Sequence, residues 1–205
     1  MIKSQHRSFY VGFFNIYTKL MIRRHFHKVD FRGEFNDKGL PLMMIGNHFS
    51  WWDGFIANFI NLRILHRKIH VMMLEEQLAG RKFLNKAGAY SIRKKNRSAF
   101  ESLRYSAELL SGKDNLVVLY PQGEFQSLFL RPVSFGKGVK VIISYALNDF
   151  QLIFYAALPE YFSSKRPSLT IYYAEADRNL LQNPGALENE YNRFLESSVN
   201  QQRPD

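Results

Sequence analysis

The chain of 205 residues contains no cysteine. This absence excludes disulfide bonds, a thiolate metal site and a cysteine nucleophile, and it agrees with a cytoplasmic location. The sequence also lacks any run of about 18 apolar residues, the length that a membrane-spanning helix requires. Its N-terminus lacks the small-residue cleavage site of a signal peptide. These absences agree with a protein that has no transmembrane span and, together with the helix described below for residues 8–23, lead us to expect peripheral attachment at the cytoplasmic face of a membrane.

Two common catalytic loops are missing as well. There is no Gly-x-Ser-x-Gly elbow, which argues against a serine hydrolase, and no Gly-x4-Gly-Lys-Ser/Thr loop, which argues against nucleotide hydrolysis. The pairs His25-x-His27 and His66-x3-His70 have tolerable metal-ligand spacing, but no carboxylate-rich segment lies near either pair. We therefore expect no metal and no cofactor.

Acidic residues are scarce relative to basic ones: 18 against 28, which gives a formal net charge of +10. Such a surface favours anionic partners, and phospholipid headgroups, nucleic acid and an acidic carrier protein all qualify. No nucleic-acid-binding motif is present, and the basic residues are scattered rather than aligned along one helix. The prediction is a membrane lipid surface as partner, and no nucleic acid.

Residues 8–23 have the pattern of a helix with a wide apolar face and basic residues at both ends. Such a helix is about 22 Å long, too short to cross a hydrocarbon core of about 30 Å, and is typical of a membrane interface. The alternative is a helix packed on the protein's own core with its polar stripe outward. We assign residues 1–28 to this N-terminal helix and residues 29–205 to the main domain. The polar stripe comprises Ser8, Gly12, Asn15, Lys19 and Arg23.

Apolar runs and helical periodicity alternate along the rest of the chain, and no repeat or proline-rich linker divides it. This alternation predicts a single α/β domain with a mixed, largely parallel sheet and flanking helices. A turn signal at residues 36–39 predicts that the strands on either side of it form a hairpin. The predicted strands are 29–35, 40–45, 69–74, 89–92, 116–120, 151–158 and 169–174, and the predicted helices are 52–62, 75–84, 98–110, 138–147 and 184–199.

A histidine follows the apolar run 42–45 and precedes an aspartate by five residues. The neutral imidazole of His48 can take a proton from a hydroxyl, and the carboxylate of Asp53 can fix its tautomer. In a continuous helix, five residues turn through about 500°, so the two side chains would not share a face. They meet if His48 lies in a loop and Asp53 in the first turn of a helix. Ser50, three residues before Asp53, matches a capping box that starts this helix.

The string Asn47-His48-x-Ser50-x-x-Asp53 resembles the first signature block of the glycerolipid acyltransferases, the family of bacterial lysophosphatidate acyltransferase. The resemblance implies a sheet with flanking helices, an acyl-chain tunnel, and acyl transfer from acyl-CoA or acyl-carrier protein to a hydroxyl of a lysophospholipid. His48 would be the general base and Asp53 would orient it, with Asn47 and Ser50 at the substrate site. The residues alone also permit a helix N-terminus beside a structural histidine.

Residues 120–127, Tyr-Pro-Gln-Gly-Glu-Phe-Gln-Ser, follow a buried strand and resemble the third block of the same family. The resemblance implies that Gln122, Gly123 and Glu124 bind substrate, because this block holds the acceptor and its phosphate. Three positions depart from the family pattern: Gln122 replaces a glutamate, Glu124 a threonine and Phe125 an arginine. These changes weaken a phosphate site, so they also admit another acceptor. The alternative is an ordinary strand-to-loop turn.

Residues 88–94, Gly-Ala-Tyr-Ser-Ile-Arg-Lys, resemble the second block more loosely. The resemblance implies that Arg93 and Lys94 bind the acceptor phosphate, although lysine lacks the bidentate fork of arginine. The alternative is a solvated basic loop. The likeness runs from about residue 40 to residue 158 and is weakest at the fourth block, where the family has a Val-Pro-Val strand.

The resulting prediction is an O-acyltransferase of phospholipid biosynthesis that needs no cofactor beyond its acyl donor. Two alternatives stay open. One is a catalytically silent, basic lipid-binding module. The other is an acyltransferase whose acceptor is not a phospholipid but an aminolipid or a pigment.

Overall fold

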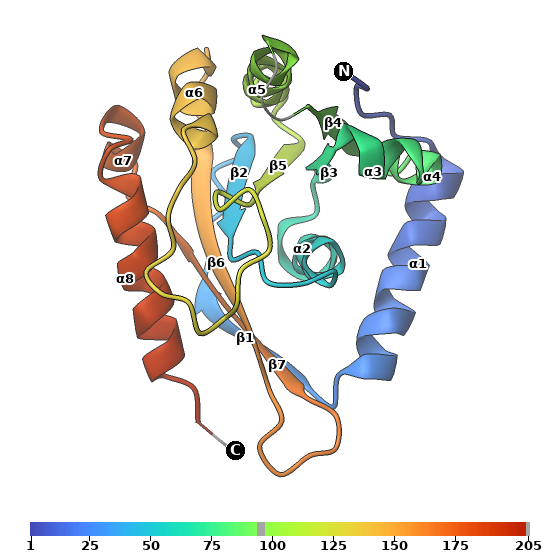
Figure 1. Cartoon of the computed structure of the whole chain (residues 1–205), viewed down its shortest axis with the longest axis vertical. Coiled ribbons are helices and arrows are strands. Elements are labelled where there is room, and N and C mark those ends of the chain that lie inside the picture. The colour runs from blue at the N-terminus through green and yellow to red at the C-terminus, as the bar shows by residue number, and fades with distance from the viewer. Residues whose placement is uncertain (94–96, 204–205) are drawn as a thin grey trace.

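A seven-stranded sheet forms the centre of the computed structural model, which describes residues 1–93 and 97–203. The strand order is β1-β7-β6-β2-β5-β3-β4 (Figure 1). β6 and β7 are antiparallel, and the other five neighbouring pairs are parallel, so the predicted mixed, largely parallel sheet is confirmed. The strands are β1 (Val29–Glu34), β2 (Leu42–Gly46), β3 (Lys68–Leu74), β4 (Ala89–Ile92), β5 (Asn115–Leu119), β6 (Gln151–Glu160) and β7 (Ser168–Glu175).

Helices cover both faces of this sheet. α1 and α2 pack on one face, and α5, α6 and α8 pack on the other (Figure 1). A π-helical turn, Asn61–Leu65, continues α2. The helices are α1 (Ser8–His25), α2 (Asp53–Ile60), α3 (Glu75–Ala79), α4 (Lys82–Asn85), α5 (Arg97–Leu109), α6 (Gly138–Tyr145), α7 (Asn179–Gln182) and α8 (Leu187–Asn200).

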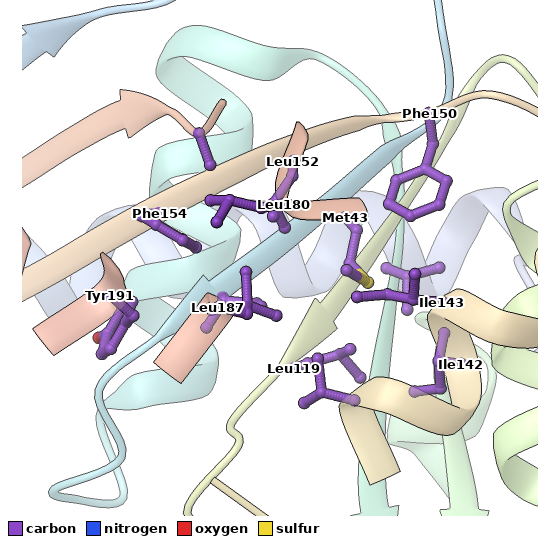
Figure 2. Close-up of a cluster of buried hydrophobic side chains, with 14 of the residues drawn as sticks. Met43, Leu119, Ile142, Ile143, Phe150, Leu152, Phe154, Leu180, Leu187 and Tyr191 are labelled. Carbon is purple, nitrogen blue, oxygen red and sulfur yellow. The ribbon is translucent and has the colours of Figure 1, made fainter. Parts of the chain in front are cut away.

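The central strand β2 is buried on both faces, which explains its unbroken apolar sequence. Leu42 and Met44 join the cluster under α1 and α2. Met43 and Ile45 point the other way, into the cluster under α6 and α8. Figure 2 shows this second cluster, where Met43 lies among side chains from α6, β6 and α8. Alternation along one strand thus connects the two halves of the core.

The predicted hairpin between the first two strands is wrong. β1 pairs with β7 at the edge of the sheet, and β2 lies in the middle between β5 and β6. The local turn signal was read correctly, because Gly39 has a φ of 69° and its N–H donates to Asp37 Oδ1. The position of each strand in the sheet follows from how much of it is buried, rather than from the turn. β2 is apolar on both faces and needs the centre, whereas the half-exposed β1 suits an edge.

Two predicted helices have different bounds in the structure. The expected helix at 75–84 is broken into α3 and α4. The last helix begins at Leu187, and Pro184 lies in the turn before it rather than in its first turn. The short helix α7 was not predicted.

The helix predicted at residues 8–23 is confirmed as α1, and its side chains are oriented unexpectedly. Thr18 is fully buried, and both Thr18 and Asn15 accept hydrogen bonds from Asn58 of α2. Asn15, which the alternative of a helix with an outward polar stripe would expose, therefore faces inward. Ser8, Gly12, Lys19 and Arg23 of the stripe are exposed, and the apolar Phe9, Phe13, Ile16 and Leu20 are exposed beside them. Within residues 1–93 and 97–203, no helix is long and apolar enough to cross a membrane.

Candidate active site

The candidate site lies at the carboxyl end of β2, in the middle of the sheet. The chain leaves β2 for β3 on one side, and β6 adds to β2 on the other, so the strand order reverses here. In open α/β sheets, ligands bind in the crevice at such a reversal. Gly46 ends β2, and a Cβ at this position would lie 2.0 Å from the ring of Tyr155. Only glycine lets the strand end against this ring.

His48 and Asp53 meet as the spacing predicts. His48 lies in the loop after β2, Asp53 is the first residue of α2, and His48 Nδ1 lies 2.7 Å from Asp53 Oδ2. The His48 side chain is 21% exposed and that of Asp53 is 2% exposed. His48 Nε2 makes no hydrogen bond within the described part of the chain. The pair therefore presents one ring nitrogen to an incoming molecule while the carboxylate holds the other.

The Asp53 carboxylate is also bound by the loop that precedes it. Oδ2 accepts the backbone N–H groups of Phe49 at 2.9 Å and Ser50 at 3.1 Å. Half of the predicted capping box is confirmed, because the acid reaches back to Ser50. The hydroxyl of Ser50 accepts the N–H of Trp52 at 3.1 Å, rather than that of Asp53. Burial raises the pKa of Asp53, and the hydrogen bonds from His48, Ser50 and Phe49 pull it down.

Aromatic rings surround the imidazole. Tyr120 stacks on His48 with ring centroids 4.4 Å apart and an angle of 16°, and Phe125 packs against it at 4.3 Å and 44°. The Tyr120 hydroxyl donates to the backbone oxygen of Asp53 at 2.8 Å, and the Tyr155 hydroxyl donates to that of Tyr120 at 3.2 Å. Burial raises the pKa of both tyrosines, so both remain donors.

Sequence reasoning missed these two tyrosines. Tyr120 has a signal, since it directly precedes the Pro-Gln-Gly turn. Tyr155 has none, because it is one apolar residue among many in a buried strand.

The loop after β5 brings Gln122 to the backbone of His48. Gln122 Oε1 accepts the N–H of His48 at 2.7 Å, and Gln122 Nε2 donates to Gln126 Oε1 at 3.2 Å. Gly123 has a φ of 71° and its N–H donates to the Tyr120 carbonyl at 3.0 Å, which closes the turn. Glu124 is exposed at the tip of this turn. Of the three residues expected to bind substrate here, Gln122 is thus within contact distance of the histidine.

Asn47 lies within the site, but its side chain serves the sheet. Asn47 Nδ2 donates to the carbonyl of Ala157, and the N–H of Ala157 donates to Asn47 Oδ1, both at 2.9 Å. The residue is 3% exposed. The amide donor and the amide acceptor of Asn47 are therefore both engaged in joining the end of β2 to β6. Substrate contact by Asn47 stays a prediction.

Arg93 follows β4, which is separated from β5 by β3. Arg93 Nε donates to Glu75 Oε1 at 2.6 Å, and the same carboxylate accepts the Ser91 hydroxyl and lies 3.6 Å from the Met1 amino group. The hydrogen bonds from Ser91 and Arg93 lower the pKa of Glu75. The charge of Arg93 is thus partly neutralised, and Lys94 lies outside the described residues.

A pocket opens beside the His48 loop, between the loop after β5 and the ends of β6 and α8. Its polar groups come from Asn47, Gln122, Gln126, Ser127 and Arg131. Its apolar lining comprises Phe49, Leu128, Leu130, Val133, Leu158 and Leu195. The described residues form no cluster of three or more metal-ligating side chains.

Comparison with known proteins agrees with this geometry. A family model described as acyltransferase matches residues 28–149, more than half of the chain. A search of curated proteins found no significant match. The matched segment includes the His48–Asp53 pair and the loop that surrounds it. The chain therefore belongs to the acyltransferase family that includes the lysophospholipid acyltransferases, and its general activity is acyl transfer.

Proposed function

We propose that this protein moves a fatty acyl group from a thioester, either acyl-CoA or acyl-carrier protein, to a hydroxyl of a lysophospholipid or a related lipid. The contact of 2.7 Å between His48 and Asp53 carries the proposal, because it leaves Nε2 open at the carboxyl end of the sheet. An aspartate bound to Nδ1 keeps the proton on that nitrogen and makes Nε2 the base.

The reaction proceeds without an acyl-enzyme. His48 Nε2 takes the proton of the acceptor hydroxyl while the oxygen attacks the thioester carbonyl. The Asp53 carboxylate stabilises the imidazolium that forms. The tetrahedral intermediate then collapses to the ester, the carbon–sulfur bond breaks, and the imidazolium returns its proton to the leaving thiolate. The products are an acylated lipid and a free thiol, and His48 ends neutral.

Two contacts weaken the phosphate site that the family pattern places beside the reacting hydroxyl, while Arg131 of the pocket lining leaves one cation near it. Phe125, rather than a cation, packs on the His48 ring. Arg93 forms an ion pair with Glu75. A phosphate monoester needs an uncompensated cation. An aminolipid or a pigment hydroxyl therefore stays as the second candidate beside lysophospholipid.

We further propose that α1 lies in the interface of an anionic membrane. Its exposed apolar face is continued by the aromatic contacts of Phe55 with Tyr17 and with the exposed Trp51, which is close in sequence to His48. At the end of α1, Arg166 of the β6–β7 connection donates to the carbonyls of Arg23 and Arg24, so three arginines gather there. Apolar side chains beside basic ones suit such a surface.

Release of free thiol from an acyl thioester, measured with and without each member of a panel of acceptors, tests the reaction. We expect acceptor-dependent release by the parent and loss of about 10²–10⁴-fold in His48→Ala. A folded His48→Ala variant that matches the parent rate would refute the mechanism. Thiol release without acceptor dependence would indicate thioester hydrolysis and would refute transfer to a lipid. No thiol release at all would favour the silent lipid-binding module.

Sedimentation with vesicles tests the membrane proposal. Phe13→Asp and Ile16→Asp together should abolish binding to vesicles that contain phosphatidylglycerol. Leu147→Asp is the matched control, because Leu147 is 90% exposed after α6, on the opposite face of the sheet. Equal binding by the two variants would contradict the proposed role of α1.

A further inference from the structure

One short segment, residues 120–126, contacts His48 at its backbone and at its ring. The ring contacts come from Tyr120 and Phe125. The backbone contacts come from Gln122, whose Oε1 accepts the His48 N–H at 2.7 Å, and from Gln126, whose N–H donates to the His48 carbonyl at 2.8 Å. Both peptide groups of His48 are thus fixed by a different part of the chain from the strand that carries it.

The amide of Gln122 has a single orientation in this arrangement. Its oxygen must face the His48 N–H, because only an acceptor can satisfy that donor. Its nitrogen then faces Gln126 Oε1 at 3.2 Å. The side chain is partly buried and both of its functional groups are engaged. Gln122 is therefore occupied by protein partners at the place where the sequence predicted a substrate ligand.

Glutamine suits this position for a chemical reason. It accepts from one neighbour and donates to the other while it remains neutral. A glutamate would keep the bond to His48 but would lose the donor to Gln126. It would also place a second carboxylate near the imidazole, and a nearby negative charge raises the pKa of histidine. A methionine of similar length would make neither bond.

We propose that Gln122 is a positioning residue for acyl transfer, which holds the backbone of His48 so that Nε2 stays in line with the acceptor hydroxyl. This inference rests on the proposed role of His48. It reassigns Gln122 from substrate binding to the alignment of the base. Displacement of a catalytic group by about 1 Å can cost about 100-fold in rate, so a bond to its backbone has a measurable effect.

Three variants test the proposal. Gln122→Met should lower kcat about 10- to 100-fold and leave the KM values for donor and acceptor within about twofold. Gln122→Glu should recover most of kcat, because it still accepts the His48 N–H, and should move the acid limb of the pH–rate profile upward.

Gln151→Met is the matched control. Gln151 is 3% exposed, its Oε1 accepts the Lys38 N–H and its Nε2 donates to the Asn36 carbonyl, so it makes the same kinds of bond. It is the first residue of β6 and pairs with Leu42 at the start of β2, at the opposite end of the strands from the site. This variant should lower Tm as Gln122→Met does and leave kcat unchanged.

Specific outcomes overturn the inference. A raised KM for the acceptor at unchanged kcat in Gln122→Met would make Gln122 a substrate ligand. Equal kcat in Gln122→Met and Gln151→Met would make its role purely structural. Full activity in His48→Ala would instead refute the proposed function, and that result is distinct from the other two.

Discussion

Two histidines, His48 in the loop after β2 and His70 in β3, each lie in a hydrogen-bonded cluster, and their partners differ. His48 follows β2, is partly exposed and contacts the carboxylate of Asp53. His70 lies inside β3 and is 3% exposed. Its neighbours are neutral apart from Lys68 and His6, and the His6 ring lies 4.6 Å away. One imidazole is prepared to accept a proton and the other is kept from doing so.

The hydrogen bonds fix the tautomer of His70. Asn115 Nδ2 donates to the Leu109 carbonyl, so Asn115 Oδ1 faces His70 Nε2 at 3.1 Å. The oxygen therefore accepts a hydrogen bond from the protonated Nε2. His70 Nδ1 must then accept the Ser4 hydroxyl at 2.8 Å, and Ser4 accepts that of Tyr105 at 2.9 Å. Burial, with the charges of His6 and Lys68, lowers the pKa of His70 to about 4. A histidine held neutral by neutral partners stabilises the fold, whereas one held by a carboxylate and open on one side serves chemistry.

The largest expected effect separates these two roles directly. His48→Ala should lower the acyl-transfer rate about 10²–10⁴-fold and leave Tm close to that of the parent, because its side chain is partly exposed. His70→Ala should do the reverse, with a loss of about 2–4 kcal/mol in stability and an unchanged rate per folded molecule. Steady-state rates and thermal melting of both variants check this. A large rate loss in folded His70→Ala would break the comparison.

Asp53→Asn tests the same difference between His48 and His70 by changing the carboxylate that contacts His48. It should lower the rate about 10²-fold or more, because a neutral amide cannot stabilise the imidazolium. Its Tm should equal or exceed that of the parent, since burial raises the pKa of Asp53 and the ionised acid therefore costs stability in the fold. Activity and melting curves at pH 7 decide it. A strongly lowered Tm would mean that the carboxylate is mainly structural.

The stability of the fold should depend on pH through His70. Its pKa of about 4 in the folded protein lies below the ordinary histidine value of 6.5, so between these values only the unfolded chain binds the proton. Stability should therefore fall as the pH falls through this window, by about 2 kcal/mol between pH 7 and pH 5. The lowered pKa of His6 acts in the same direction, and the raised pKa of Asp53 opposes it. Urea unfolding of the parent and of His70→Ala measures the difference, and identical slopes with pH would contradict this assignment.

The smallest effects concern the two serines beside these histidines. Ser4→Ala removes the hydroxyl between His70 and Tyr105, and Ser50→Ala removes the acceptor of the Trp52 N–H. Each should lower stability by about 1 kcal/mol. Only Ser50→Ala should also lower the acyl-transfer rate, because Ser50 lies in the loop that carries His48. Equal rates in the two variants would show that this loop tolerates the loss.

Local patterns were reliable where burial and spacing act over a few residues. The run 42–45 predicted a central strand because both of its faces are apolar. The distance in sequence from His48 to Asp53 excluded a shared helix and predicted a loop followed by a helix N-terminus, which is the observed arrangement. Local patterns failed to predict strand pairing, because the partners of a strand are distant in the sequence. The turn at 36–39 could not reveal that β5 and β6 occupy both edges of β2.

The sequence by itself determined the seven strands, most of the helices, the placement of a base and an acid around one loop, and the excess of positive charge, because each depends on residues close together in the chain. The tertiary structure alone decided what surrounds that base. Gln122 and Tyr120 bind His48 and Asp53 from the loop after β5, and Tyr155 of β6 binds Tyr120. Glu75 pairs with Arg93 from the end of another strand. Hydrogen bonds between such distant segments depend on strand order and register, which side-chain periodicity along a single strand does not encode.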